Sequence, residues 1–254
     1  MAPLLQLDHV SKRFGQVLVA EDLTLVVPAE GSLGIVGPNG AGKTSLFGLI
    51  SGDLTPDAGR LYFDGRDITR LDSATRCRLG IGRTYQVPRP FEGMTVFENV
   101  LVGAQQGGRE RGSASFDRAA AVLAQTGLTA EANRRAGALG LLHRKRLEVA
   151  RALATGPRLL LLDEVAGGLT DPEVALLVEI ICAIRESGVT VVWIEHVVRA
   201  LDGAVDRLIC LAGGRIVGDG TVAEVLASPA VKEIFLGTEA TAESLEEAGV
   251  GAAS

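Results

Sequence analysis

One eight-residue stretch constrains this chain more than any other: Gly37-Pro-Asn-Gly-Ala-Gly-Lys-Thr44 fits the phosphate-binding loop pattern G-x-x-x-x-G-K-[ST]. Its glycines can adopt backbone angles that side chains forbid, so successive N–H groups can turn inward around an oligophosphate. Lys43 adds a positive charge near the terminal phosphates, and the hydroxyl of Thr44 can ligate Mg²⁺. The stretch therefore predicts a site for a nucleoside triphosphate.

The flanking residues support this interpretation. Leu33–Val36 is a short apolar run that predicts a buried strand, and Ser45–Ile50 predicts a helix whose positive dipole end faces the anion. Strand, glycine-rich loop and helix thus follow in the required order. The alternative, a glycine-rich turn with a chance lysine, explains the loop but not this order.

The bulk properties limit the other classes of function. At 254 residues the chain can form one large domain or two small ones around a sizeable core. Its net charge of −6 provides no broad basic field for nucleic acid. No apolar run reaches the length of a membrane span, and no signal peptide is expected at the N-terminus. The three cysteines lack metal-ligand spacing, which favours reduced, mostly buried thiols in a cytosolic protein.

An acidic pair follows the most apolar run of the chain. Leu159–Leu162 is bounded by Pro157 and by Asp163-Glu164, as expected for a parallel strand covered on both faces. Asp163 would then lie at a carboxyl end, where α/β sheets place their ligands, and could hold Mg²⁺. Glu164 could polarise an attacking water. Alone, such a pair is more often a helix cap or a turn, but the upstream phosphate loop reverses those odds.

Two further side chains are candidates for the same site. His196 follows the predicted strand Val189–Ile194, at the edge expected for Asp163, which favours a contact with a γ-phosphate over a structural role. Phe14 is the one aromatic residue in an early turn and could stack on a purine ring. The alternative for Phe14, a half-buried strand residue, has about even odds without the phosphate loop.

The order of the remaining elements predicts an α/β core with an α+β start. An antiparallel sheet should open the chain, with an edge strand over Leu4–Val10 and further strands over Val17–Ala20 and Leu23–Val27. A helical segment should separate the later strands, and Asp171 should cap the helix that follows the acidic pair. Other expected elements are strands at 61–63, 81–86, 207–211 and 215–217, helices at 96–102, 116–125 and 147–153, a helix that starts at Asp171-Pro172 and ends at Gly188, and helices after 221 and 228.

With these features in view, the chain resembles the ATP-binding subunit of an ABC transporter over roughly Leu4 to Gly237. The resemblance implies a P-loop NTPase core of the ABC ATPase type, with an antiparallel β subdomain and an inserted α-helical subdomain over about 87–155. It implies one ATP-binding domain over 1–237, followed by an acidic tail over 238–254 that is predicted to be disordered.

The resemblance also assigns roles to residues of this sequence. Glu164 matches the catalytic glutamate, His196 the switch histidine, and Lys43 the lysine of the Walker A loop. Asp163 ends Walker B, and Gln86 matches the Q-loop glutamine that senses Mg²⁺ and the membrane subunit. The implied metal ligands are Thr44, Gln86 and Asp163, and the implied ATP contacts are Phe14, Gly37, Pro38, Asn39, Gly40, Ala41, Gly42, Lys43, Thr44, Ser45 and Gln86.

Several stretches are similar to the LivG-type subunits of branched-chain amino acid importers: Arg83–Gln86, Met94–Asn99, Arg146–Arg151 and Phe235–Gly237. The resemblance implies membrane permeases as partners, a second ATPase of LivF type, and indirectly an extracytoplasmic solute-binding protein. It places the chain peripherally at the cytoplasmic face of the inner membrane, held by the permeases. The transported solute, which the ATPase never touches, is not identified.

One motif departs from the family. The signature, Leu-Ser-Gly-Gly-Gln or a variant, should precede Arg146, but Leu139-Gly-Leu-Leu-His143 stands there, without the serine hydroxyl. Val165 replaces a usual proline, and Gly167–Thr170 replaces a D-loop that ends in Asp or Asn. Since the signature faces the partner's nucleotide, we expect a heterodimer with one competent and one impaired site rather than a homodimer.

Two alternative functions stay open. One is a nucleotide-binding regulatory subunit with impaired turnover, which the altered signature favours and the intact Glu164 and His196 oppose. The other is a soluble ABC ATPase that acts on ribosomes or DNA. Such proteins usually have two cassettes in one chain or a long coiled-coil insert, and this sequence has neither.

Overall fold

The computed structural model describes residues 3–108 and 111–236, and the chain divides into two compact units. Unit 1 consists of residues 1–71 and 192–254, and unit 2 of residues 72–191. The phosphate loop lies in unit 1, and the acidic pair lies in unit 2. The two groups of predicted site residues are therefore built by different units.

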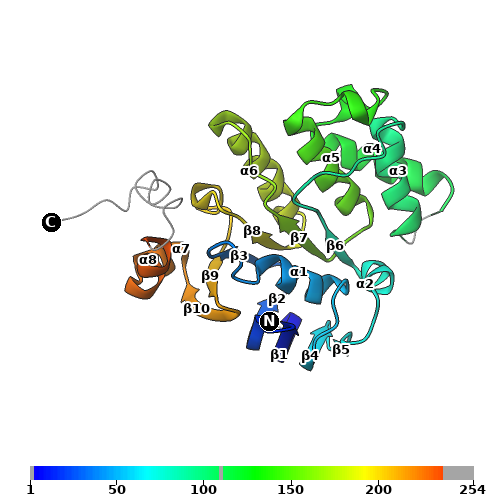
Figure 1. Ribbon diagram of the computed structural model, residues 1–254. Coiled ribbons are helices and arrows are strands. Elements are labelled where there is room, and N and C mark those ends of the chain that lie inside the picture. Colours follow the sequence, from blue (N-terminus) through cyan, green and yellow to red (C-terminus); the bar gives the residue numbers. More distant parts are fainter. Residues whose placement is uncertain (1–2, 109–110, 237–254) are drawn as a thin grey trace. The chain divides into compact units, whose positions relative to one another are not determined.

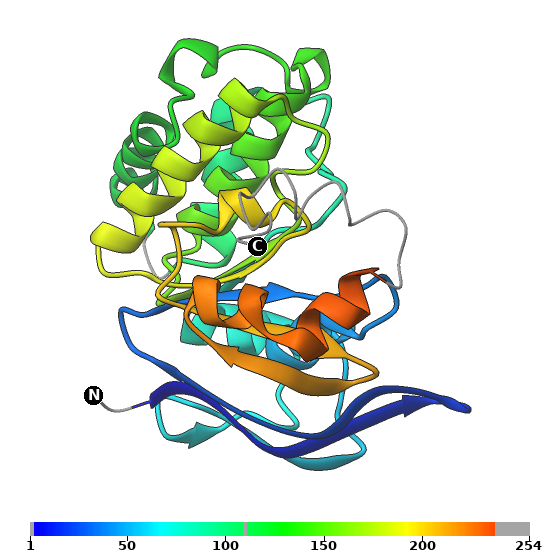
Figure 2. The same ribbon diagram turned by 90° about the vertical axis from the view of Figure 1, so that its left-hand side faces the viewer.

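An antiparallel sheet opens unit 1, with the strand order β2-β1-β4-β5. Strands β1 and β2 run side by side as a long twisted pair (Figure 2), joined at Gly15, whose positive φ of 58° permits the tight turn. Apolar side chains such as Leu5, Leu7 and Val10 are buried on the face toward the core. The strands are β1 (Pro3–Phe14), β2 (Val17–Pro28), β4 (Ala58–Phe63) and β5 (Arg66–Asp67).

Two details of this sheet differ from the sequence prediction. β1 is an inner strand rather than an edge, because both β2 and β4 pair with it. The two strands predicted before Pro28 are one strand, β2, which continues through an irregularity at Asp22. There Asp22 and His9 both adopt a positive φ, and the Asp22 carboxylate bonds to His9 Nδ1 at 2.8 Å. A bulge of this kind bends a strand without ending it.

The second sheet region of unit 1 surrounds β3, whose five residues are all buried. β9 pairs with β3 in parallel and with β10 antiparallel, as the predicted hairpin requires. The short helices α7 and α8 pack against these two strands (Figures 1 and 2). The elements are β3 (Ser32–Val36), α1 (Lys43–Ser51), β9 (Arg207–Ala212), β10 (Arg215–Gly220), α7 (Val222–Ala227), α8 (Pro229–Leu236) and the 3₁₀ turn Val198–Ala200.

The division between the units falls within strand β8 (Thr190–Ile194), all of which is buried. In unit 2, β6 pairs in parallel with β7, and β7 is a fully buried run of leucines that ends at Asp163. β6 ends at Arg83, three residues before the predicted end, so Gln86 lies in the loop beyond it. The strands are β6 (Ile81–Arg83) and β7 (Leu159–Asp163).

Helices dominate the rest of unit 2. α3, α4 and α5 pack against one another (Figure 1), in the segment where the sequence predicted a helical insertion. Val96, Val100, Leu123 and Leu147 are among the apolar side chains they bury. The helices are α2 (Ser73–Leu79), α3 (Val96–Gln106), α4 (Ser113–Gln125), α5 (Leu141–Ala154) and α6 (Asp171–Glu186), with 3₁₀ turns at Thr129–Glu131 and Ala136–Ala138.

The caps of two helices explain their start points. Thr95 and Glu98 form a capping box at α3, and Thr221 and Glu224 form the predicted one at α7. At α6 the sequence prediction was wrong by one residue, because Thr170 rather than Asp171 is the N-cap. The helix begins after Thr170 because the N–H and the hydroxyl of Thr170 both donate to the Glu173 carboxylate.

Within the described residues, no helix is both long and apolar enough to cross a membrane.

Candidate functional site

The loop between β3 and α1 takes its shape from its glycines. Gly37 has a φ of 149° and Gly42 a φ of 100°, both unfavourable for other residues. A β-carbon on Gly37 would lie 2.0 Å from the carbonyl oxygen of Leu211, and one on Gly42 would lie 2.1 Å from that of Val19. Strands β2 and β9 therefore press on the loop from their backbones, and no side chain fits at either position.

Main-chain hydrogen bonds anchor the same loop. The N–H of Gly214, in the turn between β9 and β10, donates to the carbonyl of Ala41 at 3.2 Å. The N–H of Glu21 on β2 in turn donates to the carbonyl of Gly214 at 2.8 Å. Gly42 is the N-cap of α1, whose first-turn N–H groups are the ones that a bound anion can satisfy. The geometry is that of an anion-binding loop at a helix start.

Lys43 is buried, with 5% of its surface exposed. Its ammonium donates to the carbonyls of Gly37 at 2.6 Å and Pro38 at 3.0 Å, so the side chain curls back across its own loop. The thiol of Cys210 on β9 lies within the electrostatic reach of this charge, although burial dominates and raises the pKa of Cys210 to about 11. The positive charge is thus held at the centre of the loop.

The other predicted residues of unit 1 differ in exposure. Thr44 is exposed at the first turn of α1, while Phe14 is 48% exposed at the end of β1 with the Lys12 ammonium 5.5 Å from its ring centre. His196 is half-buried just after β8, and its N–H donates to the buried carboxylate of Glu195. Glu195 also accepts from the indole of Trp193 at 3.1 Å. Sequence reasoning did not foresee this support for His196.

In unit 2, Asp163 ends β7 with 2% of its surface exposed. Arg83, at the end of the adjacent strand β6, donates from Nη2 to Asp163 Oδ2 at 3.2 Å. The N–H of Asp163 donates to the hydroxyl of Thr84 at 3.0 Å. The carboxylate is therefore fixed at the strand end where the sequence placed it. Arg83, which the sequence offered only as part of a family-like stretch, is its cation partner.

Glu164 and Gln86 are brought together in unit 2, a contact that the sequence analysis did not predict. The side-chain amide of Gln86 donates to the Glu164 carboxylate across 78 positions of sequence. Glu164 has a φ of 49°, a left-handed conformation that costs a residue with a β-carbon about 1–2 kcal/mol. Non-glycine residues keep such a conformation where their surroundings impose it, and such residues cluster at functional sites.

Helix α5 supplies polar groups that sequence reasoning missed. Lys145 is 5% exposed and donates to the main-chain carbonyls of Gln86 and Glu164. Arg151 donates to the carbonyl of Arg89 at 2.7 Å and to the Glu148 carboxylate at 3.0 Å. Burial raises the pKa of Glu148, while Arg151 and the backbone of the loop oppose that rise. The signals in the sequence were the family-like stretch Arg146–Arg151, which contains Glu148 and Arg151, and the spacing of these three charges on one helix face.

The altered signature lies at the start of α5. Gly140 is the N-cap residue and, having no side chain, makes no side-chain cap bond, where the family's serine hydroxyl would stand. Leu141, the first helical residue, is 46% exposed. A β-carbon on Gly168, in the altered D-loop, would lie 3.3 Å from the Leu141 side chain. The two departures from the family pattern are therefore neighbours in space.

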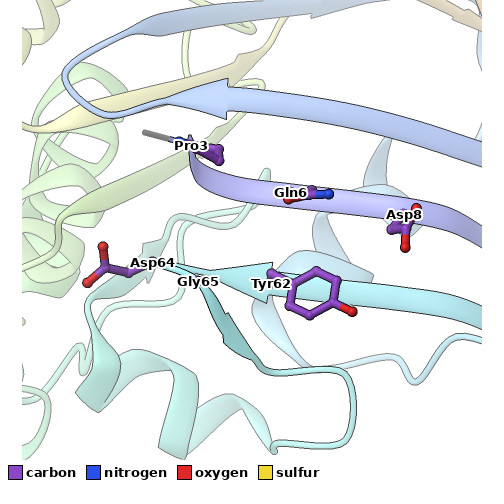
Figure 3. Close-up of a pocket in the computed structure, with 6 residues that line it drawn as sticks. All are labelled: Pro3, Gln6, Asp8, Tyr62, Asp64 and Gly65. Carbon is purple, nitrogen blue, oxygen red and sulfur yellow. The ribbon is translucent and has the colours of Figure 1, made fainter. Parts of the chain in front are cut away.

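A separate pocket of about 410 Å³ opens on the antiparallel sheet of unit 1. Figure 3 shows Pro3, Gln6 and Asp8 along β1, facing Tyr62 on β4 and Asp64-Gly65 in the turn that follows. None of the predicted site residues lines it. Within the described residues, no group of three or more His, Cys, Asp or Glu side chains could hold a metal ion by itself.

Comparisons with known proteins agree with this geometry. The family model described as ABC transporter matches residues 20–167. The chain is 34% identical to the high-affinity branched-chain amino acid transport ATP-binding protein LivG of Salmonella typhimurium, over 92% of this chain and 98% of that one. It is likewise 34% identical to BraF of Pseudomonas aeruginosa, which has the same description, with the same coverage.

Solved structures give the same result. A nucleotide-free ATP-binding cassette from an ABC transporter superposes with a TM-score of 0.83 and 30% identity, over 93% of this chain and 100% of that chain. Another cassette, in its ADP conformation, gives a TM-score of 0.85 and 29% identity over 94% and 100%. The predicted P-loop NTPase fold of the ABC type is confirmed. The chain belongs to the ABC transporter family, as an ATP-binding subunit that hydrolyses ATP.

Proposed function

We propose that this chain is the ATPase subunit of an importer for branched-chain amino acids or related small polar solutes. The single observation that carries ATP binding is the loop from Gly37 to Thr44, with its excluded β-carbons and its central Lys43. The class of solute rests on the similarity to LivG and BraF, both described as branched-chain amino acid transport proteins. Closure of a dimer on ATP and its reopening after hydrolysis would drive transport.

The proposed roles follow from the chemistry of each group. The loop amides and Lys43 bind the phosphates, and Phe14 stacks on the adenine ring. The remaining nucleotide contacts are those of the loop and of Ser45. Glu164 accepts a proton from the attacking water, and His196 contacts the γ-phosphate as it leaves. Gln86, bonded to Glu164, orients that carboxylate.

The proposed metal ligands have, residue by residue, the donor chemistry that a magnesium ion takes. Asp163 offers a carboxylate fixed at a strand end, Thr44 a hydroxyl and Gln86 an amide oxygen, all hard oxygen donors. Mg²⁺ is usually bound by one or two carboxylates together with substrate phosphates and water, so the lack of a larger acidic cluster among the described residues does not exclude it. When bound, the ion would neutralise charge on the phosphates.

The proposed partners are membrane permeases, which would hold the chain at the cytoplasmic face of the membrane, and indirectly a solute-binding protein. A second ATPase of LivF type is favoured over a second copy of this chain. The observation behind this pairing is Gly140, which leaves α5 without the hydroxyl that would face the partner's nucleotide. A homodimer would have two impaired sites, whereas a heterodimer would have one.

The same observation favours one alternative, a regulatory subunit that binds nucleotide with impaired turnover. Glu164 separates the two functions, because it would be dispensable in a regulatory subunit. Its carboxylate is held by Gln86, which is the arrangement expected of a working base.

Two substitutions test the proposal. Lys43→Ala should weaken Mg-ATP binding by about 10- to 100-fold, because a charge-assisted contact contributes about 1.5–3 kcal/mol. Titration calorimetry measures this, with Lys232→Ala on α8 as the matched control. Glu164→Gln should keep binding but lower ATP hydrolysis by about 10²- to 10⁴-fold. Unchanged binding in the first variant refutes the nucleotide site, and unchanged hydrolysis in the second favours the regulatory alternative.

A further inference from the structure

Lys145 is a buried cation whose hydrogen bonds join two distant segments. Its ammonium donates to the carbonyl oxygen of Gln86 at 3.0 Å and to that of Glu164 at 2.9 Å. Only 5% of the surface of Lys145 is exposed. Removing an ammonium from water costs several kcal/mol, which only well-placed acceptors offset. The desolvation penalty of a buried lysine at this position therefore indicates that the placement of the two carbonyl groups matters for function.

The two segments are also joined by their side chains. The side-chain amide of Gln86 donates to the Glu164 carboxylate. The two residues are therefore linked directly through their side chains and, through Lys145, by their main-chain carbonyls. Lys145 acts on the backbones and leaves the side chains to bond directly. Removing the lysine would free the backbones to move apart while leaving both reactive groups chemically intact.

The backbone of Glu164 has a particular need for such support. Its φ of 49° is maintained only where neighbouring contacts over-determine it. Its carbonyl oxygen accepts from Lys145 and, at 3.3 Å, from the N–H of Gly167. These two donors orient the peptide group that follows Glu164, and they thereby set the direction in which its carboxylate leaves the strand end.

Helix α5 holds the rest of the Gln86 loop by the same face. Glu148 and Arg151 lie three and six positions after Lys145, and Arg151 donates to the carbonyl of Arg89. The Arg151 guanidinium also lies 5.0 Å from the ring centre of Phe91. These two residues fix the loop only, whereas Lys145 reaches both the loop and Glu164. This difference separates the role of Lys145 from general support of the loop.

We propose that Lys145 is a positioning residue for ATP hydrolysis, which holds the backbones of Gln86 and Glu164 so that their side chains meet in the productive orientation. It contacts neither nucleotide nor water itself. The inference rests on the proposed function, because it takes Glu164 to be the group that polarises the attacking water.

The test is Lys145→Met in the full chain, which keeps the length of the side chain and removes its donors. Hydrolysis of ATP should fall at least tenfold, measured as single-turnover kinetics with protein in excess, while the affinity for Mg-ATP changes less than about threefold. Lys145→Arg, which restores donors, should recover most of the rate. Lys232→Met on α8 is the matched control.

A double-mutant cycle with Gln86→Ala distinguishes positioning from general stability. If Lys145 acts through the Gln86–Glu164 pair, Lys145→Met should lower the rate much less in the Gln86→Ala background than in the parent. Hydrogen exchange should also accelerate at the amides after Glu164 and not throughout unit 2. Should Lys145→Met fail to fold, Lys145→Arg and Lys145→Gln in the same cycle provide the answer.

Several outcomes would overturn the inference: a parental rate in Lys145→Met, no recovery in Lys145→Arg, or fully additive losses in the cycle. In each of these, Mg-ATP binding and the loss of hydrolysis in Glu164→Gln would still stand, so the proposed function would survive. Failure of the parent chain to bind Mg-ATP would instead remove the proposed function.

Discussion

The two groups of site residues are built in opposite ways. In unit 1 the phosphate loop is made of backbone, and its central cation, Lys43, bonds to carbonyls five and six positions earlier. In unit 2 the acidic strand end is made of side chains, and Lys145 and Arg83 reach across 59 and 80 positions. A backbone-built site depends on which positions lack a side chain. A side-chain-built site depends on which distant residues the fold brings together.

The largest effect should come from breaking the backbone-built site. Gly37→Ala places a β-carbon 2.0 Å from a main-chain oxygen that cannot move away, in addition to an unfavourable φ. We expect loss of Mg-ATP binding by at least about 100-fold, or 2.7 kcal/mol, with a lowered melting temperature. Calorimetry and thermal unfolding measure the two effects.

Gly65→Ala is the control for backbone strain alone. Gly65 also has a positive φ, of 73°, but a β-carbon there meets nothing within 4 Å. It should cost about 1 kcal/mol of stability and leave binding unchanged. Equal losses in the two variants would show that strain, and not the contact with the strand backbone, limits the loop.

An effect of similar size, on stability rather than on nucleotide binding, should come from breaking the side-chain-built site. Arg83→Met removes the cation beside buried Asp163, and breaking a buried pair costs about 3 kcal/mol. Denaturant unfolding measures this loss. The matched control is Arg215→Met, whose partner Glu21 lies on the surface of unit 1 and whose side chain is 65% exposed. An exposed pair contributes little to stability, so equal costs would contradict the burial argument.

The smallest effect concerns pH and returns to unit 1. Burial raises the pKa of Cys210 to about 11, so between the unfolded value of 9.0 and that value the native state retains a proton that the unfolded state has lost. Stability should therefore decrease as pH rises from about 9 to 11, and Cys210→Ala should remove part of the decrease. The thiolate absorbance that Cys210→Ala removes from the native protein should appear only near pH 11. Its appearance near pH 9 would contradict the burial of this thiol.

The comparison also explains what could be predicted from the sequence. The loop from Gly37 to Thr44 is local, so a short motif contained its backbone geometry, the cation and the helix start. Strand β7 was equally plain, because its four apolar residues are bounded by Pro157 and by Asp163-Glu164, as is typical of a parallel strand covered on both faces. The position of Asp163 at a strand end followed from the same run of residues, whereas the bond between Gln86 and Glu164 was not predicted.

The rest depended on contacts that leave no local pattern. Lys145 resembles any charged residue of a helix until the loop with Gln86 packs against it. Asp22 lies where the sequence predicted a break between two strands, yet its bond to His9 accompanies a bulge through which β2 continues. The cap at α6 moved to Thr170 because Glu173 competes for the backbone there. In each case a side-chain partner decided the outcome.

The close approach of the loop to its neighbours has a consequence for mutational tolerance. The atoms of Leu211 and Val19 that approach Gly37 and Gly42 most closely belong to the main chain, so these contacts do not depend on the identity of the two side chains. Both side chains are buried in the core, so substitutions there should be limited by core packing, whereas a change that rotates the peptide plane after either residue should inactivate the enzyme as a loop variant does. A survey of amino-acid preferences alone would assign both residues to the core and miss that the curvature of the nucleotide loop depends on their backbones.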